Sequence, residues 1–354
     1  MNTTEIAKPP WDRTSDTAPQ DSDRCIHPVP TLHQFAMPGW HVWCGSVVEH
    51  PTGVFNLFYS CWPETEGHEG WVTHSEIWRA EGPCPWGPFT NPAVVFAGCG
   101  RRTWDADNFH NVTVKKIGGR FFMYYTGNFG NGDWWVHRNN QRIGVAVADS
   151  TAGPWKRSPQ AILDVSPDSW DSLCVANPSV TTTPDGRVMM IYKGVTSGDL
   201  PYGSQVLHGV AFSDSPEGPF RKVKDPLFQV PGSRFPFEDP HVWHADGFFR
   251  CLMKDMVGLP GSCARATLLF ESEDGVHWPC ENYRLVATPH LESSDGAITK
   301  VSRLERPAYF LHAEQPCLSF AVKPEGDGAS FLVFVPGRVS ARALRRTHEH
   351  NPND

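Results

Sequence analysis

The segment Glu238-Asp239-Pro240-His241-Val242 decides the fold, because four other segments of similar pattern occur at nearly constant spacing along the chain. They are Cys44-Gly45-Ser46-Val47-Val48, His110-Asn111-Val112-Thr113-Val114, Ala176-Asn177-Pro178-Ser179-Val180 and Glu305-Arg306-Pro307-Ala308-Tyr309. When the segments are aligned on Gly45, Asn111, Asn177, Asp239 and Arg306, they lie 66, 66, 62 and 67 residues apart. Self-similarity at such a period indicates a fold built from repeated units.

Each repeat also carries the signals of successive β-strands. A turn glycine follows each of the first four segments after eight or nine residues, at Gly53, Gly119, Gly186 and Gly247. The run after each turn is apolar and aromatic, which is typical of a second strand paired to the first through a hairpin. Third strands are expected at 142–148, 206–212 and 266–270. A Gly-Pro-aromatic or Gly-x-x-Trp element ends each unit, at Gly87, Gly153, Gly218 and Gly275.

Five units of four strands, with almost no helical periodicity, predict an all-β fold. We expect a five-bladed β-propeller with four antiparallel strands per blade and a funnel-shaped active site on the central axis. A β-sandwich would not repeat at this length, and a parallel solenoid would use shorter repeats. The expected domains are an irregular lead-in over residues 1–33, a single propeller over 34–339 and a polar tail over 340–354.

The composition of the chain excludes several kinds of protein and of binding partner. The chain has 354 residues, of which 40% are hydrophobic and 20% charged, and this excludes a disordered or fibrous protein. A net charge of -8 without a basic block argues against a nucleic-acid partner. The chain has no apolar run long enough to span a bilayer, and its start lacks the apolar stretch of a secretory signal, so a cytoplasmic location without a membrane partner is expected. The ten cysteines contain no C-x-x-C pair, which predicts free thiols and leaves disulfides as the alternative.

The first strands of a propeller line its central channel, so the repeated segments are expected to face one another across a funnel. The predicted lining is Trp43, Cys44, Gly45, Asp107, His110, Asn111, Asn177, Glu238, Asp239, His241, Glu305 and Arg306. Such a concave site is the default location for function. Asp105 and Asp171 occupy equivalent positions in two repeats, which predicts a structural role. Asp107 has no equivalent and is expected to be functional, with a supporting turn residue as the alternative.

Adjacent residues of a strand point to opposite faces, so only one member of the acid pair at 238 and 239 should face the axis unless the entry of the strand is twisted. We favour Glu238 as the exposed acid. Asp239 is expected to hold the strand or to tune the pKa of its neighbour. Arg306 is expected either to bind a substrate oxygen or to form a salt bridge between blades.

The blade pattern, the Asn-Pro-Ser-Val and Glu-Asp-Pro-His-Val strand starts at 177 and 238, and the Asp-Gly-aromatic hairpins resemble the five-bladed propeller glycoside hydrolases of family 43 and the invertase-like and neoagarobiose-hydrolase-like families. The resemblance runs from about Trp40 to Phe334. It implies that Glu238 is a general acid. In these families the first blade usually starts with an aspartate base and the third with an aspartate that modulates pKa, whereas this chain has Cys44-Gly45 and Asn177 there. Asp107 or Glu305 is therefore expected to supply the second carboxylate.

These observations predict an exo-acting, inverting glycosidase that releases a terminal sugar from a plant or algal oligo- or polysaccharide. The expected catalytic residues are Glu238, Asp107 and Glu305. The expected substrate-binding residues are Trp43, His110, Asn111, Arg142, Asn177, Asp239, His241 and Arg306. Tryptophans near blade ends, including Trp62 and Trp71, are expected to support sugar rings or to fill gaps between blades.

Two other functions stay open. A polysaccharide lyase would use His110 or another base to abstract a proton beside a uronate, with an arginine such as Arg142 or Arg306 neutralising the carboxylate. A noncatalytic glycan-binding propeller would account for the missing family aspartates. No cofactor and no catalytic metal are expected, with a structural calcium ion left open.

Overall fold

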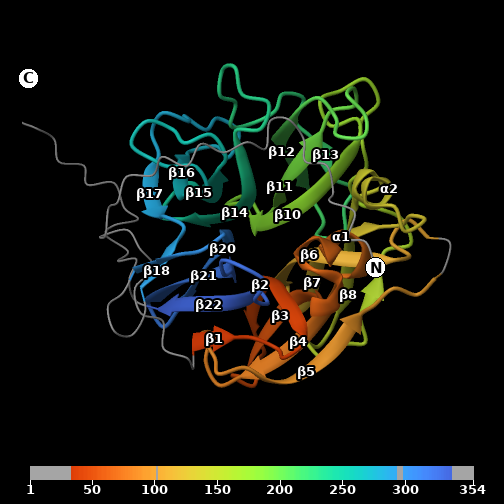
Figure 1. Ribbon diagram of the computed structural model, residues 1–354, viewed down its shortest axis with the longest axis vertical. Helices are drawn as coiled ribbons and strands as arrows, with labels where there is room; N and C mark the ends of the chain where they lie inside the picture. Colours follow the sequence, from red (N-terminus) through yellow and green to blue (C-terminus); the bar gives the residue numbers. More distant parts are fainter. Residues whose placement is uncertain (1–32, 101–102, 293–297, 337–354) are drawn as a thin grey trace, which may run out of the picture.

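The computed structural model describes residues 33–100, 103–292 and 298–336. Five four-stranded antiparallel sheets stand around a central axis (Figure 1). This is the predicted five-bladed β-propeller. The predicted lead-in, apart from residue 33, and the predicted polar tail lie outside the described residues.

Each blade is a meander whose first strand lies nearest the axis. The first two blades contain β2 (Trp40–Glu49), β3 (Phe55–Pro63), β4 (Glu76–Gly82) and β5 (Thr90–Phe96), followed by β6 (Asn108–Ile117), β7 (Arg120–Asn128), β8 (Arg142–Ala148) and β9 (Lys156–Arg157). The third and fourth contain β10 (Cys174–Thr182), β11 (Val188–Val195), β12 (Val206–Ser213) and β13 (Arg221–Lys222), followed by β14 (Phe237–Ala245), β15 (Phe248–Asp255), β16 (Thr267–Ser272) and β17 (Arg284–Ala287).

The fifth blade is completed by the N-terminal side of the described chain. Its strands are β20 (Arg303–His312), β21 (Gln315–Lys323), β22 (Phe331–Pro336) and β1 (Gln34–Phe35). In β1, Gln34 pairs with Val333 and Phe35 with Leu332, so two distant parts of the chain close the ring. The repeat does not predict β1, because a two-residue strand carries no periodicity.

A few elements lie outside the blades. They are the hairpin of β18 (His290–Glu292) and β19 (Ile298–Lys300), the short helices α1 (Trp71–His74) and α2 (Trp134–Asn139), and two 3-10 turns at Glu64–Glu66 and His68–Gly70. Helix α1 and both 3-10 turns belong to the connection between β3 and β4, and α2 belongs to the connection between β7 and β8.

The predicted hairpin glycines are confirmed by their backbone conformation. Gly53, Gly119, Gly186 and Gly247 have φ angles of 82°, 84°, 86° and 80°, which an L side chain rarely adopts. In the fifth blade, Ala313 and Glu314 make the turn at positive φ instead. This explains why the fifth unit lacks a glycine signal.

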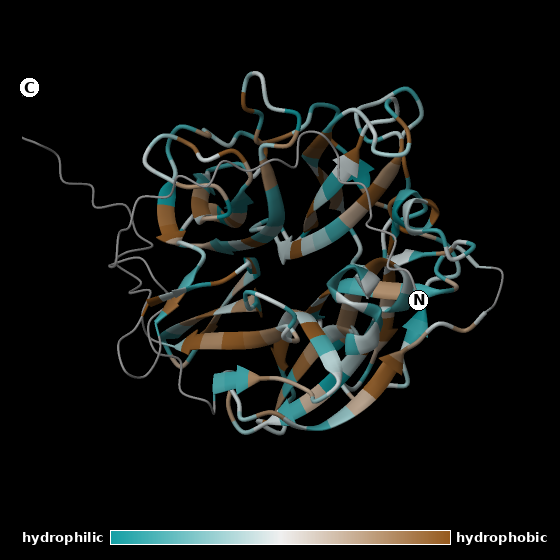
Figure 2. Ribbon diagram, in the orientation of Figure 1, coloured by the Kyte–Doolittle hydropathy of each residue, from teal (hydrophilic) through white to brown (hydrophobic). Residues whose placement is uncertain are grey.

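The hydrophobic core is divided among the interfaces between blades. Five clusters of buried apolar side chains each join two neighbouring blades; one of them, for example, packs Leu57 and Tyr59 of the first blade against Leu332 and Phe334 of the fifth. Hydrophobic residues accordingly recur along the strands of every blade (Figure 2). The nine described cysteines are free thiols, as predicted.

The predicted structural role of Asp105 is confirmed, and the same arrangement recurs at Asp171. Asp105 accepts hydrogen bonds from Tyr125 and from Arg157, each at 2.8 Å. In the next blade, Asp171 accepts from the Tyr192 hydroxyl at 3.0 Å and pairs with Lys222 at 2.5 Å. These buried carboxylates tie neighbouring strands together.

Candidate active site

At the axis, each first strand carries one residue in the left-handed conformation, beside a β-bulge. These residues are Cys44, Asn111, Asn177, Asp239 and Arg306, with φ angles of 56°, 54°, 54°, 59° and 53°. The sequence alignment placed four of them correctly. In the first blade the equivalent residue is Cys44 and not Gly45. The position of Gly45 favours glycine because of close packing, since a Cβ there would lie 2.8 Å from Leu332 Cδ1.

The five side chains, which we call the axial ring, are joined by hydrogen bonds. Cys44 Sγ donates to Asn111 Oδ1 at 2.9 Å, and Asn111 Nδ2 donates to Asn177 Oδ1. Asp239 Oδ1 then accepts from Asn177 Nδ2 at 3.2 Å and from Arg306 Nη1 at 3.1 Å. Cys44 and Arg306 contact both a pocket above the ring and a pocket below it. The ring therefore divides the central channel.

The upper pocket is a cavity of about 100 Å³. It is lined by Trp43, Cys44, Ser60, Trp62, His68, Trp71, His110, Asn111, Asn177, Lys193, Glu238, Asp239, Arg303, Glu305 and Arg306. The residue directly before the ring residue in each of four blades contributes to this lining: Trp43, His110, Glu238 and Glu305. Residues far apart in the sequence thus meet in one pocket, as predicted from the repeat.

Two carboxylates in the upper pocket share one ammonium group. Lys254 Nζ lies 2.7 Å from Glu238 Oε2 and 2.8 Å from Glu305 Oε1. Glu238 also accepts from Lys193 Nζ at 3.1 Å, and Glu305 lies 3.4 Å from Arg303 Nη1. Glu238, Glu305 and their cationic partners thus form one continuous charged network.

Lys193 and Lys254 were missed by the sequence analysis, although a signal exists. In the sheet register they stand opposite Ala176 and Glu238, on the second strands of the third and fourth blades. The equivalent residues in the other blades are small, namely Ser60, Thr126 and Ala321. An alignment of the second strands would have shown two lysines at an axis-facing position at the end of apolar runs.

This network sets the protonation of the two glutamates. Burial alone would raise the pKa of Glu238, but the ammonium groups of Lys254 and Lys193 outweigh burial and hold that pKa well below its usual value. Burial also opposes ionisation of Glu305, yet Lys254 and Arg303 lower its pKa to about 2. The glutamates in turn raise the pKa of Lys254 against the effect of its burial. Near neutral pH both glutamates are therefore ionised and Lys254 is protonated.

Asp239 and Arg306 belong to the axial ring and face each other. Besides the side-chain contact, the Arg306 backbone N–H donates to Asp239 Oδ2 at 3.3 Å. The pair joins the fourth and fifth blades, which is the interblade salt bridge expected as one alternative for Arg306. Burial, with help from the Glu238 carboxylate, raises the pKa of Asp239 against the attraction of Lys254 and Arg306.

His110 is held by side chains on both sides of its ring. Its Nδ1 lies 2.6 Å from Asn108 Oδ1, and its Nε2 lies 3.1 Å from Gln141 Nε2. Because an amide nitrogen only donates, Nε2 accepts and Nδ1 carries the proton. Burial holds the His110 pKa well below its usual value, so the imidazole is neutral. Trp71 packs against this histidine in a T-shaped arrangement, with ring centroids 5.1 Å apart.

Aromatic side chains form the wall of the pocket beside the first blade. Trp43 and Trp62 both pack against His68, with ring centroids 4.9 and 5.8 Å apart. His68 was not predicted, because it lies in a 3-10 turn outside the repeated segments. Burial, together with the charge of Arg303, lowers its pKa to about 3.

Three predicted site residues lie outside the lining of the upper pocket. Asp107 is half-buried, and its Oδ2 accepts from the Gly130 backbone N–H at 2.9 Å, which is the contact of a supporting turn residue. Arg142 pairs with Asp164 and donates to the Gln141 carbonyl at 2.8 Å. His241 lies on the other side of the axial ring, in the lower pocket. The roles predicted for these residues stay predictions.

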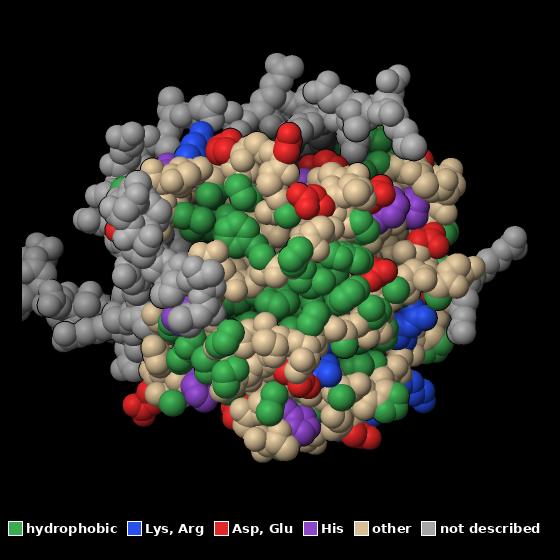
Figure 3. Space-filling view, turned by 60° about the horizontal axis from the view of Figure 1, so that its bottom comes forward, with side chains coloured by type: hydrophobic (Ala, Val, Ile, Leu, Met, Phe, Trp, Pro, Cys, Tyr) green, Lys and Arg blue, Asp and Glu red, His purple; other side chains and the backbone are tan. Residues whose placement is uncertain are grey.

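Within the three described ranges, no group of three or more His, Cys, Asp or Glu side chains could hold a metal ion. No helix in this part of the chain is long and apolar enough to cross a membrane. On the face seen in Figure 3, hydrophobic side chains gather across the middle, and lysine and arginine side chains are scattered.

No family model matches the chain. Chitinase C of Streptomyces lividans is 27% identical over 112 residues, a match that covers 30% of this chain and 17% of the chitinase. The chain thus corresponds to less than a fifth of the length of that curated relative.

Solved structures resemble the whole propeller. A glycoside hydrolase matches with a TM-score of 0.66 at 13% identity, covering 88% of this chain and 92% of that chain. A thermostable family-43 glycoside hydrolase matches with a TM-score of 0.59 at 12% identity over 84% and 89% of the two chains. A family 117 glycoside hydrolase from Zobellia galactanivorans matches with a TM-score of 0.56 at 16% identity over 89% of each. The chain has the fold of the five-bladed propeller glycoside hydrolases.

Proposed function

We propose that the protein is a glycoside hydrolase and that the upper pocket is its active site. The observation that carries this proposal is the convergence of Glu238 and Glu305, from two different blades, on Lys254. Glycoside hydrolysis needs a pair of carboxyl groups beside the scissile bond, one to protonate the leaving oxygen and one to assist attack. The tryptophans of the pocket offer the apolar faces on which sugar rings stack.

In this proposal Glu238 is the general acid and Glu305 the second carboxylate. Because ammonium groups hold the pKa of Glu238 well below its usual value, Glu238 must gain a proton as substrate enters. A bound sugar would exclude water and separate Glu238 from the ammonium of Lys193, which lines the same pocket. Both changes raise the pKa of a carboxylate. Lys254 remains beside both glutamates, so the pKa of Glu238 must rise against its attraction while it stabilises the charge of Glu305.

We further propose exo action. The axial ring closes the floor of the pocket, and a cavity of about 100 Å³ suits the end of a glycan better than its middle. The family resemblance implies inversion, but because Lys254 contacts both glutamates, their nearest oxygens lie within about 5.5 Å of each other, less than the separation of about 6.5–9.5 Å in inverting enzymes. Inversion by this pair therefore requires the sugar to spread the two carboxylates.

The test is an oligosaccharide panel, with products followed by a reducing-end assay and by ultraviolet absorbance. Glu238→Gln is expected to lower kcat by about 10²–10⁴-fold while sugar binding persists, since general acid catalysis contributes that much. Glu273→Gln, at an exposed turn, is the matched control and should keep full activity. Unchanged turnover by Glu238→Gln would overturn the assignment of the acid.

A noncatalytic glycan-binding role is the second candidate. Two features favour it: neighbouring cations lower the pKa of both glutamates, and the first and third blades place Cys44 and Asn177 where the resembling families have aspartates. Saturable sugar binding without any product, in wild type and Glu238→Gln alike, would support it. An unsaturated, absorbing product would instead support a lyase, although both nitrogens of His110 already have partners.

A further inference from the structure

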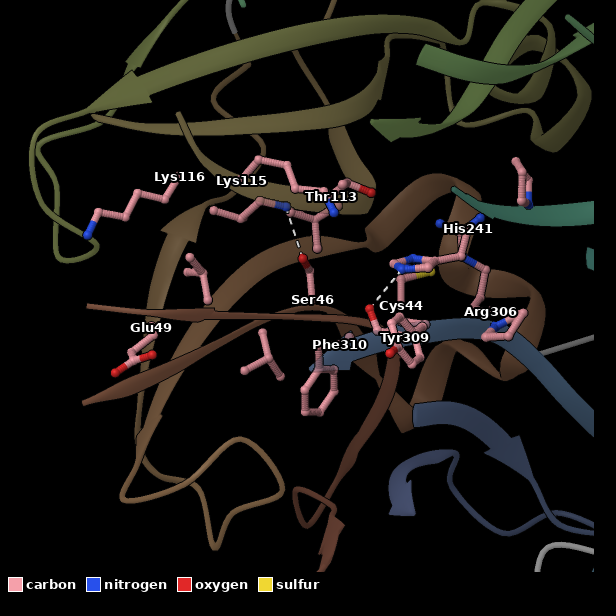
Figure 4. Close-up of a pocket in the computed structure, with 18 residues that line it drawn as sticks. Cys44, Ser46, Glu49, Thr113, Lys115, Lys116, His241, Arg306, Tyr309 and Phe310 are labelled. Atoms are coloured by element: carbon pink, nitrogen blue, oxygen red, sulfur yellow. Dashed lines mark hydrogen bonds between the residues drawn. The ribbon is translucent and has the colours of Figure 1, made fainter. Parts of the chain in front are cut away.

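The lower pocket lies on the far side of the axial ring from the proposed active site. It is a cavity of about 230 Å³, larger than the upper pocket, and it lies among the first strands of the first, second, fourth and fifth blades. Figure 4 shows its side chains, with Lys115 and Thr113 on one side and His241, Tyr309 and Phe310 on another. The proposed hydrolase activity does not use this pocket.

Lys115 of β6 is the unusual residue of the lower pocket. It is half-buried, and no charged or hydrogen-bonding group among the described residues acts on its ammonium. Other buried cations of the described chain have such a partner: Lys254 lies 2.7 Å from Glu238, Arg306 3.1 Å from Asp239, and Arg250 2.8 Å from Glu271. The Nζ atom of Lys115 still reaches water. An ammonium that is partly removed from water without a partner nevertheless carries a desolvation cost.

No carboxylate inside the pocket relieves this cost. Burial lowers the pKa of Lys115 to about 8, and no acidic group opposes the effect. His241 is neutral: its Nε2 donates to the Tyr309 carbonyl at 3.0 Å, while burial and the nearby charge of Lys115 lower its pKa to about 3. Glu49 also lines the pocket, but it is exposed. A negative charge brought by a ligand would supply the missing partner.

The rest of the wall is largely apolar. Val47, Pro240, Pro307, Ala308 and Phe310 line the cavity. Two of the lining hydroxyl groups have protein partners, since Ser46 Oγ accepts from the Val114 N–H at 2.9 Å and Thr113 Oγ1 donates to the Pro178 carbonyl at 2.8 Å. An apolar ligand body would be removed from water favourably against the apolar part of the wall.

We propose that the lower pocket binds a small organic carboxylate with an apolar body. Its carboxylate pairs with the ammonium of Lys115, and its body lies between the proline and Phe310 side chains. The charge-assisted contact fixes the orientation of the ligand, and the apolar wall supplies the affinity.

Calorimetric titration of the full chain with benzoate tests this proposal, with acetate and inorganic phosphate as comparison probes. Benzoate is expected to bind about tenfold or more tightly than acetate, because only benzoate has an apolar body to bury. Phosphate binding as tight as benzoate would overturn the proposed ligand class.

Lys115→Met and Lys115→Gln are the variants, and Lys156→Met, on the exposed strand β9, is the matched control. Both Lys115 variants are expected to weaken benzoate binding about tenfold or more, and the control is expected to leave it unchanged. Two substitutions at Lys115 are used because the test needs only one variant that folds. Saturable binding that is the same in wild type and in a folded Lys115 variant would overturn the proposal, as would the absence of saturable binding to the wild type.

Discussion

Lys254 is the residue on which the upper pocket depends. Its side chain is 2% exposed and lies within hydrogen-bond distance of two carboxylates, while a third, Asp239, is 3.7 Å away. Without this ammonium the pocket would contain buried like charges only partly balanced by Lys193 and Arg303. The same residue keeps Glu238 and Glu305 ionised.

Lys254→Met is expected to lower the free energy of unfolding by about 3–5 kcal/mol near neutral pH, because breaking a buried ion pair leaves uncompensated charge. The pKa of Glu305 is depressed in the folded protein, so the stability it contributes is present above its ordinary value of 4.5 and is lost as pH falls toward about 2. The effect of the substitution should therefore shrink below pH 4.5.

Urea denaturation at several pH values measures this effect. The control adds Glu238→Gln and Glu305→Gln to Lys254→Met, which removes the stranded charges and should recover most of the stability. If the triple variant is no more stable than Lys254→Met, charge compensation is not the role of this lysine.

Lys193 offers a test of the proposed acid through pH. A reaction that needs protonated Glu238 loses kcat/KM as pH rises through the pKa of this group, which two ammonium groups hold low. Lys193→Met removes one of them, so the Glu238 pKa rises and the falling limb of the kcat/KM profile should move to higher pH. Lys156→Met should leave the profile in place. If the falling limb stays at the same pH in Lys193→Met, Glu238 is not the group whose protonation controls kcat/KM.

At the scale of the element, the inner strand is the unit that positions the site. Its β-bulge turns one residue into the axial ring and directs the preceding side chain of four blades into the upper pocket. A bulge re-aims side chains that a regular strand would alternate between faces. This is why Glu238 and Asp239, although adjacent, both line the upper pocket.

Substitutions at Asn177 separate two contributions of a ring residue to stability, its side-chain hydrogen bonds and its left-handed backbone conformation. Asn177→Ala loses the hydrogen bonds to Asn111 and Asp239 and places a Cβ at a φ of 54° without asparagine's tolerance of that conformation. We expect a loss of about 1–3 kcal/mol in the free energy of unfolding. Asn177→Gly loses the same bonds but relieves the backbone and should be less destabilised. Guanidinium denaturation decides between them, and a less stable glycine variant would contradict the role assigned to the backbone.

At the scale of the molecule, the repeat made the fold predictable. The anchors at Asn111, Asn177, Asp239 and Arg306 recur because each blade must present one left-handed residue to the axis. The turn glycines recur because each hairpin needs a positive φ. The closing strand β1 was missed because its pairing with β22 is set by the tertiary fold and leaves no local pattern.

The site was predictable only where it follows the repeat. Glu238 and Glu305 directly precede ring residues, so their convergence could be expected. Lys254 and Lys193 lie on second strands, where an apolar run suggests core, and their contacts with Glu238 depend on the sheet register. Asp107 precedes β6, and its contact with Gly130 is set by loop structure that the repeat does not specify.

A structure of Glu238→Gln with a bound oligosaccharide would show whether the upper pocket is the active site. We expect a terminal sugar in the upper pocket beside the tryptophans, with its glycosidic oxygen within about 3.2 Å of the residue 238 side chain, the reach of a proton donor. A sugar bound elsewhere on the propeller, with the upper pocket unoccupied, would contradict this assignment.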